Sequence, residues 1–171
     1  LGEYDKALEY HEIALDYLTK FEDENSKFIT LNNIGDTFLN QNDYITAISY
    51  FKRVLDTDDF IKKDPLIYSK ALSNYARSKL YLRDTSGISA SFSKAMYLQD
   101  SLNDIVSMSL TNYYMAEYAL VKKDTNSAIA YAKKSNSLAK LSTNNKRVLE
   151  SLKLIGELDT KNASQYVQEY I

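Results

Sequence analysis

A short acidic motif recurs five times along this chain of 171 residues, at nearly constant spacing. In each copy an acidic residue is followed by Tyr or Thr and, three positions later, by a small or apolar residue, and the last residues of successive copies are 40, 41, 40 and 35 positions apart. Such a period is typical of repeat arrays, in which each unit buries its apolar face only against its neighbours. The sequence therefore predicts a repeat protein that presents a surface. The five copies are Glu3–Ala7, Asp43–Ala47, Asp84–Ile88, Asp124–Ala128 and Asp159–Ala163.

The composition favours an all-α fold. Only four glycines and one proline occur, which is few for a β fold with many tight turns. The net charge is −2, and the 21 Lys and Arg residues are scattered among 23 Asp and Glu residues, so we expect no nucleic-acid surface in this segment. No apolar run approaches the roughly 20 residues that span a bilayer, and no signal-peptide pattern opens the chain.

Between the motifs the apolar residues follow helical spacing, as at Phe28, Leu31, Ile34 and Phe38. The polar run at 40–43 separates two such stripes and predicts a tight turn within an antiparallel pair. We therefore expect an all-α, right-handed α-solenoid of antiparallel helix pairs, forming one repeat domain over residues 1–171. The expected helices are 3–20, 26–40, 43–57, 65–82, 85–100, 103–122, 125–140, 144–157 and 160–171, in units of roughly 1–24 (second helix only), 25–62, 63–101, 102–142 and 143–171.

Several residues predict local features of these helices. A carboxylate just before a helical stripe can accept hydrogen bonds from the first free amides, which predicts N-caps at four motif aspartates. Pro65 suits the first turn of a helix. Gly35 lies in a helix interior, where glycine costs about 1 kcal/mol relative to alanine, so we expect two helix backbones to approach closely there. The four expected caps are Asp43, Asp84, Asp124 and Asp159.

The most regular units resemble the tetratricopeptide repeat. Residues 2–10 followed by Ala14 and Leu15 look like the second helix of such a unit, and the following unit fits it nearly throughout. Later units depart from the pattern, because the usual Trp and the closing Pro are missing and the period exceeds the common value of about 34. The matching residues of the second unit are Leu31, Ile34, Gly35, Asn42, Asp43, Tyr44, Ala47, Ile48, Tyr50, Phe51 and Leu55; the departures are Thr85, Ile88, Thr125 and Ser135.

A looser resemblance concerns the protein to which this segment belongs. The stretches 113–118, 128–132 and 148–152 are similar to the sensory region of bacterial membrane-anchored sensor histidine kinases and related transcriptional regulators. The chain starts at a Leu inside a repeat unit, so we expect it to be part of a longer protein. The resemblance implies a periplasmic location; without it the chain is expected to be cytoplasmic, and the sequence alone leaves the compartment unknown.

The sequence offers little for catalysis or for cofactors. His11 is the only histidine and no cysteine occurs, so transition-metal sites and Cys-His or Ser-His catalysis within one chain are not expected. The acidic runs at 22–24 and 56–59 lack the spacing of a calcium loop. The four glycines are too far apart to form a phosphate-binding loop. We expect no enzyme activity, no cofactor and no metal.

The resemblance implies a concave binding face on the first helix of each unit. A stripe in steps of four beside the small packing position faces that groove in this family, and its mixed polar and aromatic side chains suit peptide recognition. The competing interpretation is a solvated inner face on which Arg77 pairs with Asp36 or Glu117. The candidate residues are Asn32, Asp36, Asn40, Ser73, Asn74, Arg77, Tyr81, Tyr113 and Glu117.

These features together predict a scaffold that binds protein or peptide, as the sensory or interaction domain of a bacterial signalling or regulatory protein. Asn74 matches one position of the carboxylate clamp of chaperone-binding members, but no positive charge stands at the other positions, so capture of an acidic C-terminal tail is not expected. The alternative is a structural module that self-associates through uncapped end helices into a homo-oligomer.

Overall fold

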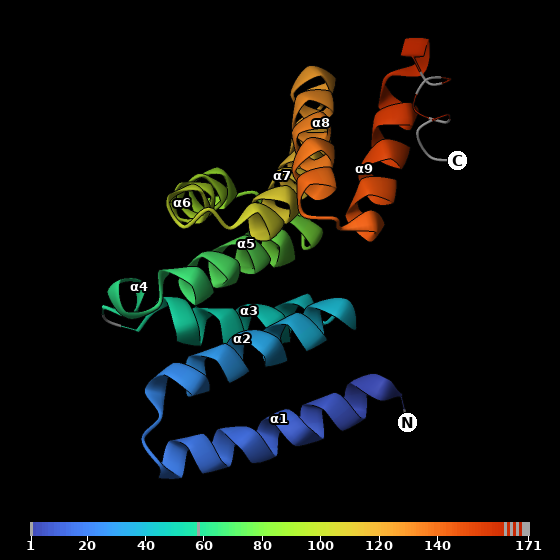
Figure 1. Ribbon diagram of the computed structural model, residues 1–171. Coiled ribbons are helices and arrows are strands. Elements are labelled where there is room, and N and C mark those ends of the chain that lie inside the picture. The colour runs from blue at the N-terminus through green and yellow to red at the C-terminus, as the bar shows by residue number, and fades with distance from the viewer. Residues whose placement is uncertain (1, 58, 163, 165, 167, 169–171) are drawn as a thin grey trace. The chain divides into compact units, whose positions relative to one another are not determined.

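The computed structural model describes residues 2–57, 59–162, 164, 166 and 168 (Figure 1). This described part contains helices and no strand, which confirms the all-α prediction. It divides into two compact units, Leu1–Leu98 and Gln99–Ile171, and each is described by itself. The helices are α1 Glu3–Lys20, α2 Glu24–Asn40, α3 Tyr44–Leu55, α4 Phe60–Lys63, α5 Pro65–Tyr81, α6 Ile88–Ser101, α7 Ile105–Val121, α8 Thr125–Leu141 and α9 Asn145–Leu158, followed by a short 3-10 helix at Thr160–Asn162.

Most helices that follow one another in sequence within a unit pack side by side. In the first unit α2 packs against α1, α3 and α5, around a core that includes Phe28, Leu31, Phe51 and Val54. In the second unit α8 packs between α7 and α9, and Ala116, Ala132 and Ile155 form a buried cluster. This stacking of helix pairs confirms the predicted solenoid class of fold. The grouping of residues 1–171 into a single repeat domain stays a prediction.

The same tight turn joins the helices at regular intervals of the sequence. Its middle residue has a positive φ, as at Asn42 with φ 63°, and the N–H of the next residue, Asp43, donates to the carbonyl of Phe38 at 2.9 Å. Asn42 N–H also donates to Leu39, so the turn is a Schellman motif that satisfies the last carbonyls of one helix. The positive-φ residues at these turns are Glu22, Asn42, Arg83, Asn103, Lys123 and Thr143.

The residue after the positive-φ position caps the next helix at most of these turns. Asp43 accepts from Thr46 N–H at 3.1 Å and Asp124 from Ser127 N–H at 3.0 Å, which confirms two predicted N-caps. A single three-residue turn therefore ends one helix and starts the next, which keeps the pairs close together. Further N-caps, which lie outside the five motifs, are Asp23, Asp64, Asp104 and Asn144; Pro65 follows Asp64 at the first position of α5, as predicted.

Two of the predicted N-caps, Asp84 and Asp159, are wrong. Asp84 accepts from the backbone N–H of Ser86, two residues on, at 3.0 Å, because Gly87 with φ 70° delays the start of α6 until Ile88. Asp159 is the C-cap residue of α9, and its carboxylate accepts from the hydroxyl of Tyr166 at 2.9 Å. Half of the residues of the helix predicted at 160–171 lie outside the described residues, and its first three, Thr160–Asn162, form a 3-10 helix.

Gly35 lies where a close approach was predicted, but for a different reason. A Cβ added to Gly35 would lie 2.6 Å from Cε1 of the Phe51 ring. The close neighbour is thus an aromatic side chain of α3 and not a helix backbone, which corrects the prediction. The ring of Phe51 is fully buried and occupies the space that the missing side chain leaves on α2.

The segment between α3 and α5 contains a helix that the sequence patterns did not predict. The four residues of α4 bring Phe60 into the first unit, where its side chain is buried and its ring centroid lies 4.3 Å from that of Phe28. Among the described residues no helix is long and apolar enough to cross a membrane.

Candidate functional site

Asp36 and Arg77 interact on neighbouring helices of the first unit. Asp36 is half-buried on α2, and Arg77 is half-buried on α5, which packs against α2. The positive charge of Arg77 acts on the Asp36 carboxylate, and the side-chain amide of Asn40 donates to Asp36 Oδ2 at 3.4 Å. The structure thus brings together three of the predicted site residues.

Burial changes the pKa of the Asp36 carboxyl. Loss of hydration raises its pKa above the ordinary value for aspartate, although the charge of Arg77 and the hydrogen bond from Asn40 both act to lower the pKa. Desolvation is the largest of these effects, so the ionised carboxylate is less stable in the folded chain than in the unfolded chain. Asp36 therefore opposes folding at neutral pH.

Replacing Asp36 by asparagine is expected to raise the melting temperature at pH 7. The folded-state pKa of Asp36 lies above its unfolded-state pKa, so the contribution of this residue to stability falls as the pH rises from the ordinary aspartate value through the raised one. Below the ordinary value both states bind the proton, and the difference between wild type and Asp36→Asn should vanish. Thermal unfolding followed by circular dichroism between pH 3 and pH 8 measures this. A variant that is less stable than wild type at pH 7 would contradict the argument.

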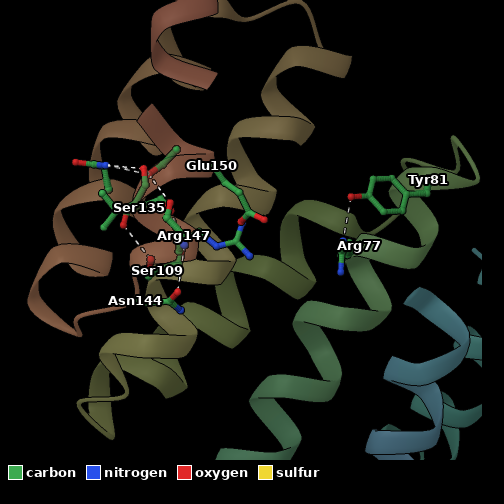
Figure 2. A network of polar contacts seen from close by, with 10 residues as sticks. Arg77, Tyr81, Ser109, Ser135, Asn144, Arg147 and Glu150 are labelled. Carbon is green, nitrogen blue, oxygen red and sulfur yellow. Dashed lines mark hydrogen bonds and ion pairs between the residues drawn. The ribbon is translucent and has the colours of Figure 1, made fainter. Parts of the chain in front are cut away.

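Two tyrosines extend this group of residues. Arg77 Nε donates to the hydroxyl of Tyr81 at 3.2 Å, one turn further along α5, and the guanidinium lies 5.2 Å from the centroid of the Tyr81 ring (Figure 2). The Tyr81 ring in turn lies 5.1 Å from the ring of Tyr44, the first residue of α3. We name the five residues Asp36, Asn40, Tyr44, Arg77 and Tyr81 the α2–α5 cluster.

The α2–α5 cluster combines the groups that recognise polypeptides. It contains a carboxylate, a side-chain amide, a guanidinium and two aromatic rings, so it can accept and donate hydrogen bonds and stack against side chains. Tyr44 was assigned to the repeat pattern in the sequence and not to the site. Its place beside Tyr81 depends on the packing of two helices, which the motif spacing does not report.

Three other candidate residues of the first unit are buried and are not exposed on a surface. Asn32, Ser73 and Asn74 are 6%, 3% and 8% exposed. Ser73 donates to the carbonyl of Ser69 on its own helix at 3.2 Å. The Oδ1 atom of Asn32 is buried and has no hydrogen-bond partner among the described residues. Contact of these three side chains with a ligand stays a prediction.

The remaining candidates, Tyr113 and Glu117, are half-buried on α7 in the second unit. The guanidinium of Arg147, from the start of α9, lies 4.4 Å from the centroid of the Tyr113 ring, a distance typical of cation–π contacts. Arg147 also pairs with Glu150 at 2.8 Å between Nη1 and Oε2 (Figure 2). Sequence patterns did not identify Arg147, because two turns and the whole of α8 separate it from α7 in the sequence.

A pair of serines explains one departure from the tetratricopeptide pattern. Ser109 Oγ donates to the carbonyl of Ser135 at 2.9 Å, and Ser135 Oγ donates to the carbonyl of Ser109 at 2.8 Å (Figure 2). Both serines are buried between α7 and α8. Ser135, where alanine is usual, therefore replaces an apolar contact by a reciprocal hydrogen bond.

An open cavity of about 380 Å³ lies beside α4 in the first unit. Its lining contains the rings of Phe28 and Phe60 and the charged side chains of Glu24 and Lys63. Within the described ranges, no three His, Asp or Glu side chains stand together as metal ligands would.

Comparison with known families supports the resemblance seen in the first units. Residues 1–59 match a family model described as Tetratricopeptide repeat. These repeats generally mediate protein–protein interaction and typically serve as non-catalytic scaffolds. No curated protein is similar enough to the chain to give a match.

Proposed function

We propose that this chain is a scaffold that binds protein or peptide, and that its ligand contacts the α2–α5 cluster. The observation that supports this most is that the half-buried Asp36, hydrogen-bonded to Asn40, belongs to the same cluster as Arg77, Tyr81 and Tyr44, which contact one another; burial also raises the pKa of Asp36. An ionised carboxylate that destabilises the folded chain is typical of a binding site, where a ligand contacts it. A surface with only a structural role gains nothing from such a group.

Recognition would use the separate groups of the α2–α5 cluster for different parts of an extended ligand. Asp36 and Asn40 can accept hydrogen bonds from backbone or side-chain donors, and Arg77 can donate to a carbonyl or carboxylate. The rings of Tyr44 and Tyr81 offer apolar area at low cost in side-chain entropy. We expect both basic and acidic side chains in the ligand, because the cluster contains a carboxylate and a guanidinium.

We further propose that the chain is the sensory or interaction domain of a bacterial signalling or regulatory protein. The support is the sequence resemblance of residues 113–118, 128–132 and 148–152 to such sensory regions. The sequence that flanks this segment in its gene tests the proposal. A membrane span followed by a kinase or a DNA-binding region would support it and imply a periplasmic location, and flanks without these would contradict it.

The alternative function is a structural module that associates with copies of itself. The exposed apolar side chains of α1 show a surface that a partner can cover, and a second copy of the chain is one such partner. Self-association predicts a mass that rises with concentration and does not respond to substitutions in the α2–α5 cluster. Groove binding predicts a monomer.

Replacing Arg77 by alanine is expected to weaken peptide binding by about 10- to 100-fold, because hydrogen bonds to charged groups contribute about 1.5–3 kcal/mol. The peptide would be selected from a displayed random library against the wild-type chain, and its dissociation constant measured by calorimetry. Arg53→Ala is the matched control, since Arg53 also lies over a tyrosine ring, at 5.3 Å from Tyr50, but on α3. Equal losses for both variants would exclude the α2–α5 cluster as the site.

A further inference from the structure

Four large apolar side chains form an exposed stripe along α1 and its C-cap residue, Phe21. Tyr10, Ile13, Tyr17 and Phe21 are 71%, 49%, 59% and 77% exposed. Their spacing of three, four and four residues places them on one face of the helix. The rings of Tyr17 and Phe21 are stacked, with centroids 6.5 Å apart. We name these four residues the α1 stripe.

The α1 stripe differs from the later second helices at the position of Ile13, whereas Tyr50 and Tyr131 stand at the position of Tyr10. The later second helices carry Arg53, Lys94 and Lys134 at the position of Ile13, and all three are exposed. A charged side chain at this place is well hydrated, whereas an isoleucine there exposes apolar surface to water. The first repeat thus differs from the others in a way that favours a covering partner.

An acidic strip borders the α1 stripe. Asp5, Glu9, Glu12 and Asp16 follow one another at spacings of four, three and four residues, so they also share one helix face, and all four are exposed. Residues 3–24 contain eight acidic residues and two lysines. One of these lysines, Lys20, pairs with Asp16 at 2.6 Å. The helix presents three surfaces: a side that packs against α2, the apolar stripe, and the acidic strip.

We propose that the α1 stripe binds an amphipathic helix of a partner protein, whose apolar face is bordered by lysine or arginine. The apolar face would cover the four exposed side chains, and the basic border would face Asp5, Glu9, Glu12 and Asp16. Two copies of this chain that paired through the stripe would bring two acidic strips into one interface, which like charges disfavour. This site is separate from the α2–α5 cluster and goes beyond the proposed function.

The test uses the whole chain and two synthetic peptides of about 18 residues, or about five helical turns. One is an amphipathic helix of leucine and lysine, and the other has glutamate in place of lysine. The lysine peptide is expected to bind more weakly as salt rises, and the glutamate peptide is expected not to bind. The double variant Tyr17→Ser, Phe21→Ser should lose about tenfold or more in affinity. Glu9→Gln with Glu12→Gln should weaken binding and its salt dependence.

Matched controls separate this site from others. Tyr97→Ser removes an equally exposed tyrosine, 75% exposed on α6, and should leave the affinity unchanged. Arg77→Ala should also leave it unchanged. Unchanged binding in the α1 double variant overturns the proposal; if Arg77→Ala alone weakens binding, the peptide occupies the α2–α5 cluster and the proposed function still stands. A concentration-dependent dimer that the α1 double variant abolishes, measured by sedimentation, assigns the stripe to a second copy and also overturns the proposal.

Discussion

Replacing Gly35 by leucine is expected to lower the free energy of unfolding by about 2–3 kcal/mol, a typical cost of overpacking a filled core. The first atom of any side chain at this position would lie 2.6 Å from Cε1 of Phe51, closer than two carbon atoms approach without a shift. Phe51 is fully buried, so its ring cannot move away without displacing other core residues. Urea unfolding followed by circular dichroism measures the change.

The matched control for this substitution is Gly156→Leu in α9. Both glycines lie inside helices, but a Cβ at Gly156 would meet no atom within 4 Å. Leucine there should leave stability unchanged or raise it by up to about 1 kcal/mol, because glycine is a poor helix former. A Gly35→Leu variant that loses less than about 0.5 kcal/mol would show that the contact between α2 and α3 is wrongly placed.

Replacing Phe51 by alanine is expected to have the larger effect, a loss of about 3–5 kcal/mol. The side chain is 0% exposed and belongs to the core cluster of the first unit with Phe28, Leu31 and Val54. Its removal would leave a cavity facing Gly35, where no side chain is present to fill it. Phe21→Ala is the control, since Phe21 is 77% exposed and its loss should change stability by no more than about 0.5 kcal/mol.

The two substitutions should not be additive. Once the ring of Phe51 is gone, a leucine at position 35 can occupy part of the cavity, so Gly35→Leu should destabilise the Phe51→Ala variant less than it destabilises wild type. Unfolding free energies of the four proteins give the coupling directly. Additive losses would mean that the two residues do not share the same space in the folded chain.

Sequence patterns predicted most helices because the apolar period and the polar turns both depend on local residues. Gly35 was recognised as a packing position by its place in the repeat, but the ring that fills the space is 16 residues away and belongs to another helix. The start of α6 was misplaced because Gly87 extends the turn after Asp84. Helix α4 has four residues, too few to show a period.

The candidate site shows a similar limit. Steps of four place Asp36 with Asn40 and Arg77 with Tyr81, and a hydrogen bond joins each pair, since such spacing reports direction around a helix. The spacing does not indicate how deeply a side chain is buried. Packing between α2 and its neighbours leaves Asn32 only 6% exposed. Contacts such as that of Arg147 with Tyr113 depend on how two helices pack, which no single stripe describes.

The hydrogen bonds between helices have a consequence for how the chain folds during its synthesis. Ser109 and Ser135 exchange hydrogen bonds over 26 positions, and the same separation joins Lys94 to the hydroxyl of Tyr68. Contacts this close in sequence form quickly, because only a short loop has to close. A growing chain can therefore complete each helix pair from residues that are already synthesised. The helix faces that pack against the next pair are exposed to solvent only for a short time.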